Sequence, residues 1–164
     1  MVFIPNSFIE DSIEHFSKVK IEELVFVNKI ICAQHLPIHD RDNHSVNLAL
    51  LTNILEFVNS YHIDDKKTRI IKKAVYLLEG ISYKHPFGDG NRRTAFYAFT
   101  EFLERNGFFL VISNDKDRNE FVNLLGKLSD EEINFYSEIE LFILRSGRIL
   151  EIKKEEEKWQ EGLK

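Results

Sequence analysis

A loop of nine residues, His85-Pro-Phe-Gly-Asp-Gly-Asn-Arg-Arg93, constrains the fold of this chain more than any other stretch. It lies between two long segments whose apolar residues recur at helical spacing. The proline and the two glycines end the first helix, and the Asp and Asn residues favour a turn that starts the second at about Asn91. The first amides of a helix lack partners within the helix and lie at the positive end of its dipole. The loop therefore predicts an anion-binding site at a helix start, next to a histidine, an aspartate and two arginines.

The spacing of apolar residues in the rest of the chain predicts an all-α fold, in which a helical bundle surrounds the motif loop and the helix after it. We expect helices at about residues 7–18, 21–34, 45–61, 64–83, 91–106, 114–128 and 129–144. Residues 108–112 are typical of a short strand, and we expect at most a short β-hairpin flap beside the helices. The tail from Arg148 predicts a solvated helix or a frayed end.

Length and composition predict one soluble domain over residues 1–164, with a core at about 20–147 and a solvated tail at 148–164. The net charge of −5 argues against a general nucleic-acid binder. Cys32 is the only cysteine, so we expect neither an internal disulfide nor a thiolate metal cluster. No apolar stretch is long enough for a membrane span, and the N-terminus lacks the pattern of a signal peptide. We therefore expect a cytoplasmic protein without a membrane partner.

Three side chains of the loop suit catalysis, metal binding and anchoring. A histidine can take up a proton near neutral pH, so His85 is a candidate general base, although a histidine that merely ends a helix is the plainer interpretation of that residue alone. Asp89 could hold Mg²⁺, which prefers one or two carboxylates together with phosphate oxygens and water, or it could simply serve the turn. Phe87 is expected to anchor the loop in the core.

The remaining residues of the loop suit phosphate binding. Gly88 and Gly90 have no side chain to keep backbone amides away from a phosphate. Asn91 can donate its amide to a phosphate or cap the helix. Arg92 and Arg93 lie in the first helical turn, where a cation opposes the helix dipole unless an anion is bound.

The pattern H-P-F-x-D-G-N-x-R is similar to the signature loop of the Fic/Doc (Fido) family, and the resemblance covers about residues 20–147. It implies that His85 activates a Ser, Thr or Tyr hydroxyl of a target protein and that Asp89 binds the Mg²⁺ that accompanies a nucleotide. The residues implied in holding the phosphates are Gly90, Asn91 and Arg93. The chain is then expected to be a transferase that moves a phosphate-containing group from ATP, or another nucleotide, to that hydroxyl.

Two positions depart from the family members that transfer AMP, which usually have a glycine and a further arginine where this chain has Arg92 and Phe96. Doc-type toxins resemble this chain at both positions, with a lysine and an apolar residue, and they transfer the γ-phosphoryl group. The resemblance therefore favours phosphoryl transfer, with AMP transfer or a lapsed nucleotide-binding module as alternatives. The inhibitory signature of the family lacks its Ser or Thr here, because Glu157 precedes Glu161-Gly162. If the activity is restrained, we therefore expect a separate antitoxin-like partner rather than an internal inhibitory helix.

The polar stretch 35–44 is the candidate for a flap that docks the target protein. In the Fic/Doc family such a flap precedes the motif and binds the target segment by strand addition. The residues expected to form it here are Pro37, Ile38 and His39. The same stretch also offers metal ligands, namely His35, His39, Asp40, Asp42 and His44. A solvated loop is a better interpretation than a metal site, because Pro37 interrupts the pair His35 and His39.

A remote alternative is a metal-dependent phosphohydrolase of the HD type. The metal doublet would be His39-Asp40, with His15 and Asp89 as further ligands. That doublet belongs within a helix, and Pro37 argues against a helix there. The target protein, the preferred base and the oligomeric state are left open by the sequence.

Overall fold

The computed structural model describes residues 18–34, 45–129, 135–145 and 149–151. These residues form mostly helices, which confirms the all-α fold. The helices are α2 (Ile21–Ala33), α3 (Leu48–Ser60), α4 (Lys66–Lys84), α5 (Asn91–Arg105), α6 (Asp115–Ser129) and α7 (Phe135–Leu144), and the strands are β1 (Phe108–Leu110) and β2 (Ile149–Glu151). The helix expected at 7–18 lies outside the described residues. None of the described helices is long and apolar enough to cross a membrane.

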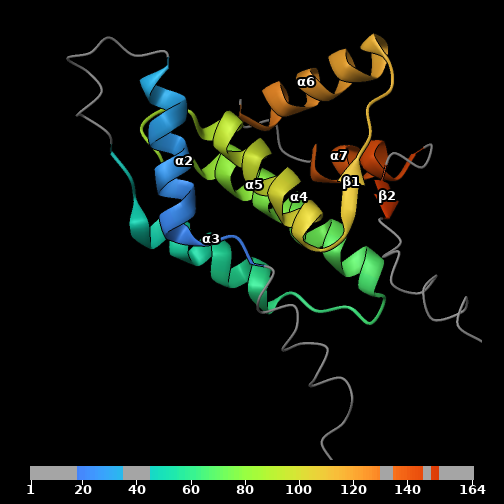
Figure 1. Cartoon of the computed structure of the whole chain (residues 1–164), viewed down its shortest axis with the longest axis horizontal. Coiled ribbons are helices and arrows are strands. Elements are labelled where there is room, and N and C mark those ends of the chain that lie inside the picture. Colours follow the sequence, from blue (N-terminus) through green and yellow to red (C-terminus); the bar gives the residue numbers. More distant parts are fainter. Residues whose placement is uncertain (1–17, 35–44, 130–134, 146–148, 152–164) are drawn as a thin grey trace, which may run out of the picture.

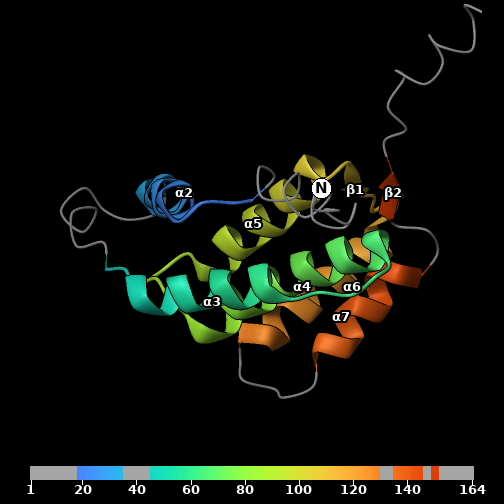
Figure 2. The ribbon, with the colours of Figure 1, turned by 90° about the horizontal axis from the view of Figure 1, so that it is seen from below.

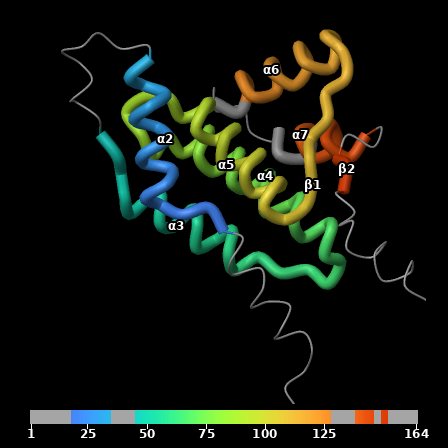
Figure 3. Tube along the Cα trace, in the orientation of Figure 1, coloured from blue at the N-terminus to red at the C-terminus, as the bar shows by residue number. Residues whose placement is uncertain are grey.

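Helix α5 runs through the middle of the molecule, with α4 along it and with α2 and α6 to either side (Figure 1; Figure 3). A second view shows α2 and α7 on opposite sides of the molecule, with α5 and α4 between them (Figure 2). The buried apolar side chains of α5 recur at helical spacing: Ala95, Ala98, Phe99, Phe102 and Leu103. They pack against an equally apolar stripe of α4, so the loop between the two helices is held on a rigid base.

Polar caps start the helices near the positions that the sequence predicts. Asp65 accepts a hydrogen bond from the Thr68 amide (2.8 Å) at the start of α4, as expected. Helix α3 begins at Leu48 rather than at about 45, because Asn47 is the capping residue and accepts from the Leu50 amide (3.0 Å). Residues 45–47 instead run beside the motif loop, where Val46 forms a β-bridge with Phe87.

Strands β1 and β2 form a two-stranded antiparallel sheet in which Leu110 pairs with Ile149. The expectation of a solvated helix or tail from Arg148 is therefore wrong for residues 149–151. Pairing with β1 satisfies the backbone of both strands, and it buries Ile149 to 6 % exposure.

A polar cluster fastens α2 to α5. The Tyr97 hydroxyl donates to Glu23 Oε1 (2.7 Å), and Arg105 pairs with both Glu23 and Glu101. Burial alone would raise the pKa of the Glu23 carboxyl, but hydrogen bonds from Arg105 and Tyr97 outweigh it and hold that pKa below its ordinary value. Burial, with the hydrogen bond to Glu23, raises the pKa of Tyr97 to about 12. The cluster fixes the first turn of α2 against the last turns of α5.

Candidate active site

His85 ends α4 in a left-handed backbone conformation, with φ 51° and ψ 60°. Among the described residues it is the one non-glycine residue with a positive φ. This conformation costs an ordinary L-residue roughly 1–2 kcal/mol, so the packing around the loop must impose it. The side chain of His85 is exposed, and the residue is the first of the motif loop.

The first half of the loop is held by backbone bonds to residues 45–47. Asn47 N donates to Pro86 O (2.7 Å), and Gly88 N donates to Ser45 O (3.0 Å). Between these two bonds Phe87 lies in the hydrophobic core, where an anchor of the loop belongs. Gly88 also lies close to Ser45, because a Cβ at position 88 would come within 2.4 Å of the serine Oγ. The loop and the segment before α3 therefore form one unit.

Asn91 closes the loop on itself. Its Oδ1 accepts from Phe87 N (3.0 Å), and its Nδ2 donates to Phe87 O (2.8 Å). The pair satisfies both backbone groups of a buried residue, which would otherwise be costly. The side-chain amide that we expected on a phosphate is thus engaged within the loop, and a phosphate contact by Asn91 stays a prediction.

The start of α5 has free backbone amides at the positive end of the helix dipole. Gly90 is its N-cap, with φ 73°, and Thr94 N donates to Gly90 O (2.9 Å) as the first backbone bond of the helix. The amides of residues 91–93 precede that bond and point along the helix axis toward the loop. Asp89 Oδ1 accepts from Gly90 N (2.6 Å), so the carboxylate lies beside the same helix end.

Helix α2 forms the floor under this turn. A Cβ at position 90 would come within 3.0 Å of Asn28 Nδ2 and 3.1 Å of Cys32 Sγ, so both the space and the backbone angle at this position require glycine. Arg93 reaches the carbonyl of Ile31 at 3.5 Å, the outer limit for a hydrogen bond. Burial, with the nearby charge of Asp89, raises the pKa of the Cys32 thiol, which keeps it protonated at neutral pH.

One cavity of about 930 Å³ brings the polar residues of the motif together. Its lining includes seven residues of the loop and of the start of α5, namely His85, Gly88, Asp89, Gly90, Asn91, Arg92 and Arg93. The rest of the lining is mostly apolar and comes from α5, α6 and the segment between them: Phe96, Ile112, Arg118, Phe121, Val122 and Leu125. A site with a cationic part and an apolar part suits a nucleotide, whose phosphates and base differ in the same way.

Sequence reasoning missed the contribution of α6. Arg118, Phe121, Val122 and Leu125 share one face of a helix at i, i+3, i+4 and i+7, and that spacing was the available signal. Which element that face would meet depends on how the helices pack. Arg118 adds a third guanidinium to those of Arg92 and Arg93, and it pairs with Asp115 on its own helix at 3.3 Å.

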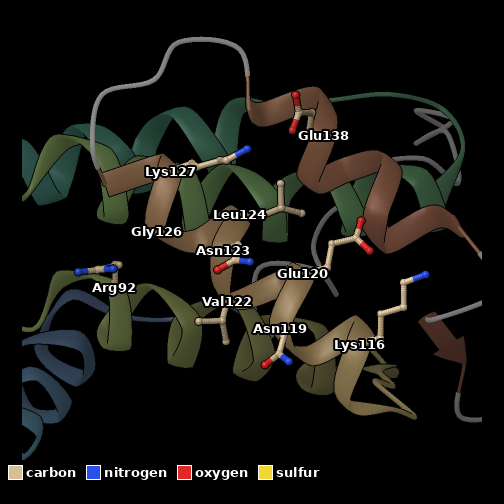
Figure 4. Close-up of a pocket in the computed structure, with 10 residues that line it drawn as sticks. All are labelled: Arg92, Lys116, Asn119, Glu120, Val122, Asn123, Leu124, Gly126, Lys127 and Glu138. Carbon is tan, nitrogen blue, oxygen red and sulfur yellow. The ribbon is translucent and has the colours of Figure 1, made fainter.

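Arg92 lies at the boundary with a second cavity of about 1,010 Å³, which is lined chiefly by α6 (Figure 4). A Cβ at Gly126 would come within 3.8 Å of Arg92 Nη1, so the arginine reaches across to the C-terminal part of α6. A cation is favoured near a helix C-terminus.

Asp89 stays the candidate metal ligand that the sequence predicts. Among the described residues, no three His, Cys, Asp or Glu side chains gather into a metal-binding group. A single carboxylate fits Mg²⁺, which takes its remaining ligands from phosphate oxygens and water. The expected flap residues Pro37, Ile38 and His39 lie outside the described residues. The same is true of His15 and of the doublet His39-Asp40, which the phosphohydrolase alternative requires.

Comparison with known proteins gives one match. The model of the Fic/DOC family matches residues 19–103, just over half of the chain. The matched stretch runs from the start of α2 to within α5 and contains the whole motif loop. Searches of curated proteins and of solved structures found no match.

Proposed function

The chain belongs to the Fic/DOC family, and we propose that it transfers a phosphate-containing group from a nucleotide such as ATP to a Ser, Thr or Tyr hydroxyl of a target protein. One observation carries the proposal. His85, Asp89, Arg93 and the start of α5 face a single cavity, and the cavity combines a cationic part with an apolar part. A base, a metal-capable carboxylate and an anion site in one place are what transfer from a nucleotide needs.

The proposed reaction gives His85 the role of general base. The hydroxyl oxygen of the target attacks the phosphorus atom of the γ-phosphoryl group, and the imidazole takes up the hydroxyl proton. The bond from that phosphorus to the bridging oxygen breaks, and ADP leaves with the electron pair. Base catalysis of this kind contributes about 10² to 10⁴-fold to a rate.

The negative charge of the phosphates is balanced by groups at the start of α5. Arg93 offers a fork of donors to phosphate oxygens, the free amides of α5 add a fixed dipole, and Arg118 faces the same space from α6. Asp89 would hold Mg²⁺ beside them, and the ion would supply charge neutralisation to the phosphates. These groups supply most of what the reaction needs, since catalysis of phosphoryl transfer depends mainly on positioning and electrostatics.

The residues at positions 92 and 96 favour the γ-phosphoryl group as the group transferred. AMP-transferring members of the family, as noted above, usually have a glycine and an arginine there. Phe96 is 38 % exposed, lines the cavity and contacts Phe121 with ring centroids 5.9 Å apart, so this position presents an apolar surface instead of a cation. Arg92 stands where Doc-type members have a lysine and Phe96 where they have an apolar residue, so the chain is similar to them at both positions.

Incubation of the protein with cell lysate and labelled ATP tests the proposal. ATP labelled at the γ-phosphate should label a protein band, ATP labelled at the α-phosphate should not, and His85→Ala should abolish the signal. Label from the α-phosphate would mean AMP transfer instead. Absence of label from every nucleotide tried would contradict catalysis and favour the lapsed binding module.

A further inference from the structure

Asn28 is a completely buried polar residue of α2, outside the motif, whose side chain joins both sides of the Asp89–Thr94 turn. Its Nδ2 donates to the carbonyl oxygen of Asp89 (2.9 Å) and to Thr94 Oγ1 (2.8 Å). These partners stand 61 and 66 residues away along the chain. One amide therefore ties the loop and the first turn of α5 to α2.

Both ends of this amide have hydrogen-bond partners in the orientation found. Both Nδ2 protons have acceptors, and Oδ1 accepts from the Cys32 thiol at 3.8 Å. A reversed amide would place Oδ1 against the Asp89 carbonyl, which can only accept, so this partner favours the orientation found.

The bond to the Asp89 carbonyl matters for the site because it sets the direction of a peptide plane. Because its carbonyl accepts the hydrogen bond from Asn28, the Asp89–Gly90 peptide lies against α2. The Asp89 side chain lines the cavity. Gly90 N then donates to Asp89 Oδ1 (2.6 Å), which limits the rotation of the carboxylate. Helix α2 is itself fixed to α5 by the Glu23 cluster, so Asn28 acts from a rigid support.

We propose that Asn28 is a positioning residue of the site, which fixes the Asp89–Gly90 peptide and thereby aims the Asp89 carboxylate at the metal-bound nucleotide. Outer partners that orient a metal ligand are typically worth about 10- to 100-fold in metal affinity or activity. The nucleotide in this inference rests on the proposed function, whereas the effect of Asn28 on the loop does not.

Two variants of α2 separate an effect on the position of the loop from a general loss of stability. Asn28→Leu keeps the size of the side chain and removes the amide. Leu24→Ala, four residues earlier on the same helix and equally buried, destabilises α2 without touching the loop. Thr94→Val and Thr94→Ser form a second pair, since serine keeps the acceptor for Asn28 and valine removes it.

Hydrogen exchange of the folded proteins tests the effect on the loop without any ligand. In Asn28→Leu, exchange of the amides at 87–94 should rise about tenfold relative to those of α4, as expected for the loss of two buried hydrogen bonds. Thr94→Val should show part of that rise in loop exchange. In Thr94→Ser, exchange of the loop amides should stay as slow as in the wild type. In Leu24→Ala the ratio of loop to α4 exchange should stay as in the wild type. An unchanged ratio in Asn28→Leu would overturn the proposal.

Binding of ATP with Mn²⁺, a spectroscopic substitute for Mg²⁺, tests the consequence for the site. The Kd should rise about tenfold in Asn28→Leu and less than about twofold in Leu24→Ala. A looser loop with an unchanged Kd would overturn the positioning role. If the wild type binds no nucleotide, the proposed function fails, and the exchange ratio alone decides whether Asn28 orders the loop.

Discussion

His85 combines the imidazole that we propose as the general base with a backbone conformation that most residues avoid. Glycine adopts φ 51° without strain, although it also gives the unfolded chain more freedom. We expect His85→Gly to raise the free energy of unfolding by roughly 0.5–1 kcal/mol and to abolish transfer. Urea denaturation measures the change in the free energy of unfolding. Lys84→Gly, one residue earlier and inside α4, is the control and should lower stability by about 1 kcal/mol. A loss of stability in His85→Gly would show that the conformation is not strained.

The Asn91 side chain should matter more for folding than its place in the motif suggests. In Asn91→Ala, the amide and the carbonyl of buried Phe87 lose their partners. We expect the free energy of unfolding to fall by about 2–3 kcal/mol, measured by urea denaturation. Asn91→Asp should also destabilise, because a carboxylate would face the Phe87 carbonyl now 2.8 Å from Nδ2. A cost below about 0.5 kcal/mol for Asn91→Ala would mean that the loop does not depend on this pair.

The residues of the site could be predicted to different extents, for a physical reason. His85, Asp89 and Arg93 lie in one turn, so their proximity follows from the local backbone and could be read from the motif. Asn28 and Arg118 reach the site from other helices. Their positions depend on tertiary packing, which a single sequence does not reveal.

At the scale of elements, the short sheet should stabilise the fold through one of its side chains. Ile149 is buried, whereas its neighbour Leu150 is 54 % exposed. Ile149→Ala should therefore cost about 2 kcal/mol or more, and Leu150→Ala should stay within about 0.5 kcal/mol. Thermal and urea unfolding of the two variants check this. Equal effects would contradict the observed register of β2 on β1.

The contact between α2 and α5 predicts a loss of stability in alkali. The folded-state pKa of Tyr97, about 12, exceeds its ordinary value of 10.0, so the unfolded chain releases this proton first. The stability contributed by Tyr97 is therefore complete below pH 10 and decreases as the pH rises toward about 12. Tyr97→Phe should remove that part of the pH dependence. Parallel stability curves for wild type and Tyr97→Phe over this range would refute the assignment.

Long elements could be predicted and short ones could not. Helices α4 and α5 carry several turns of apolar periodicity and recognisable ends at Asp65 and Gly107. Three residues of β2 carry too little alternation to reveal a strand, and its partner lies some forty residues earlier. The start of α3 was misplaced because Ser45 and Asn47 are both good caps, and pairing with the motif loop decides between them.

For the whole molecule, the cavity between the motif loop and α6 implies that nucleotide binding stabilises the fold. A ligand at 100 times its Kd adds about 2.7 kcal/mol, so ATP with Mg²⁺ should raise Tm. Arg118→Ala should weaken nucleotide binding by about tenfold, as the loss of one charge-assisted contact would. Lys67→Ala, at an exposed position in the first turn of α4, controls for the loss of one positive charge away from the cavity. Equal affinities of Arg118→Ala and Lys67→Ala would place the nucleotide elsewhere.

The most direct test of the central claim is a comparison of γ-labelled and α-labelled ATP with wild type and His85→Ala. The arrangement of His85, Asp89, Arg92 and Arg93 predicts that only the γ-label reaches a target protein, that this requires Mg²⁺, and that His85→Ala loses it while remaining folded. Label that persists in folded His85→Ala would contradict the account.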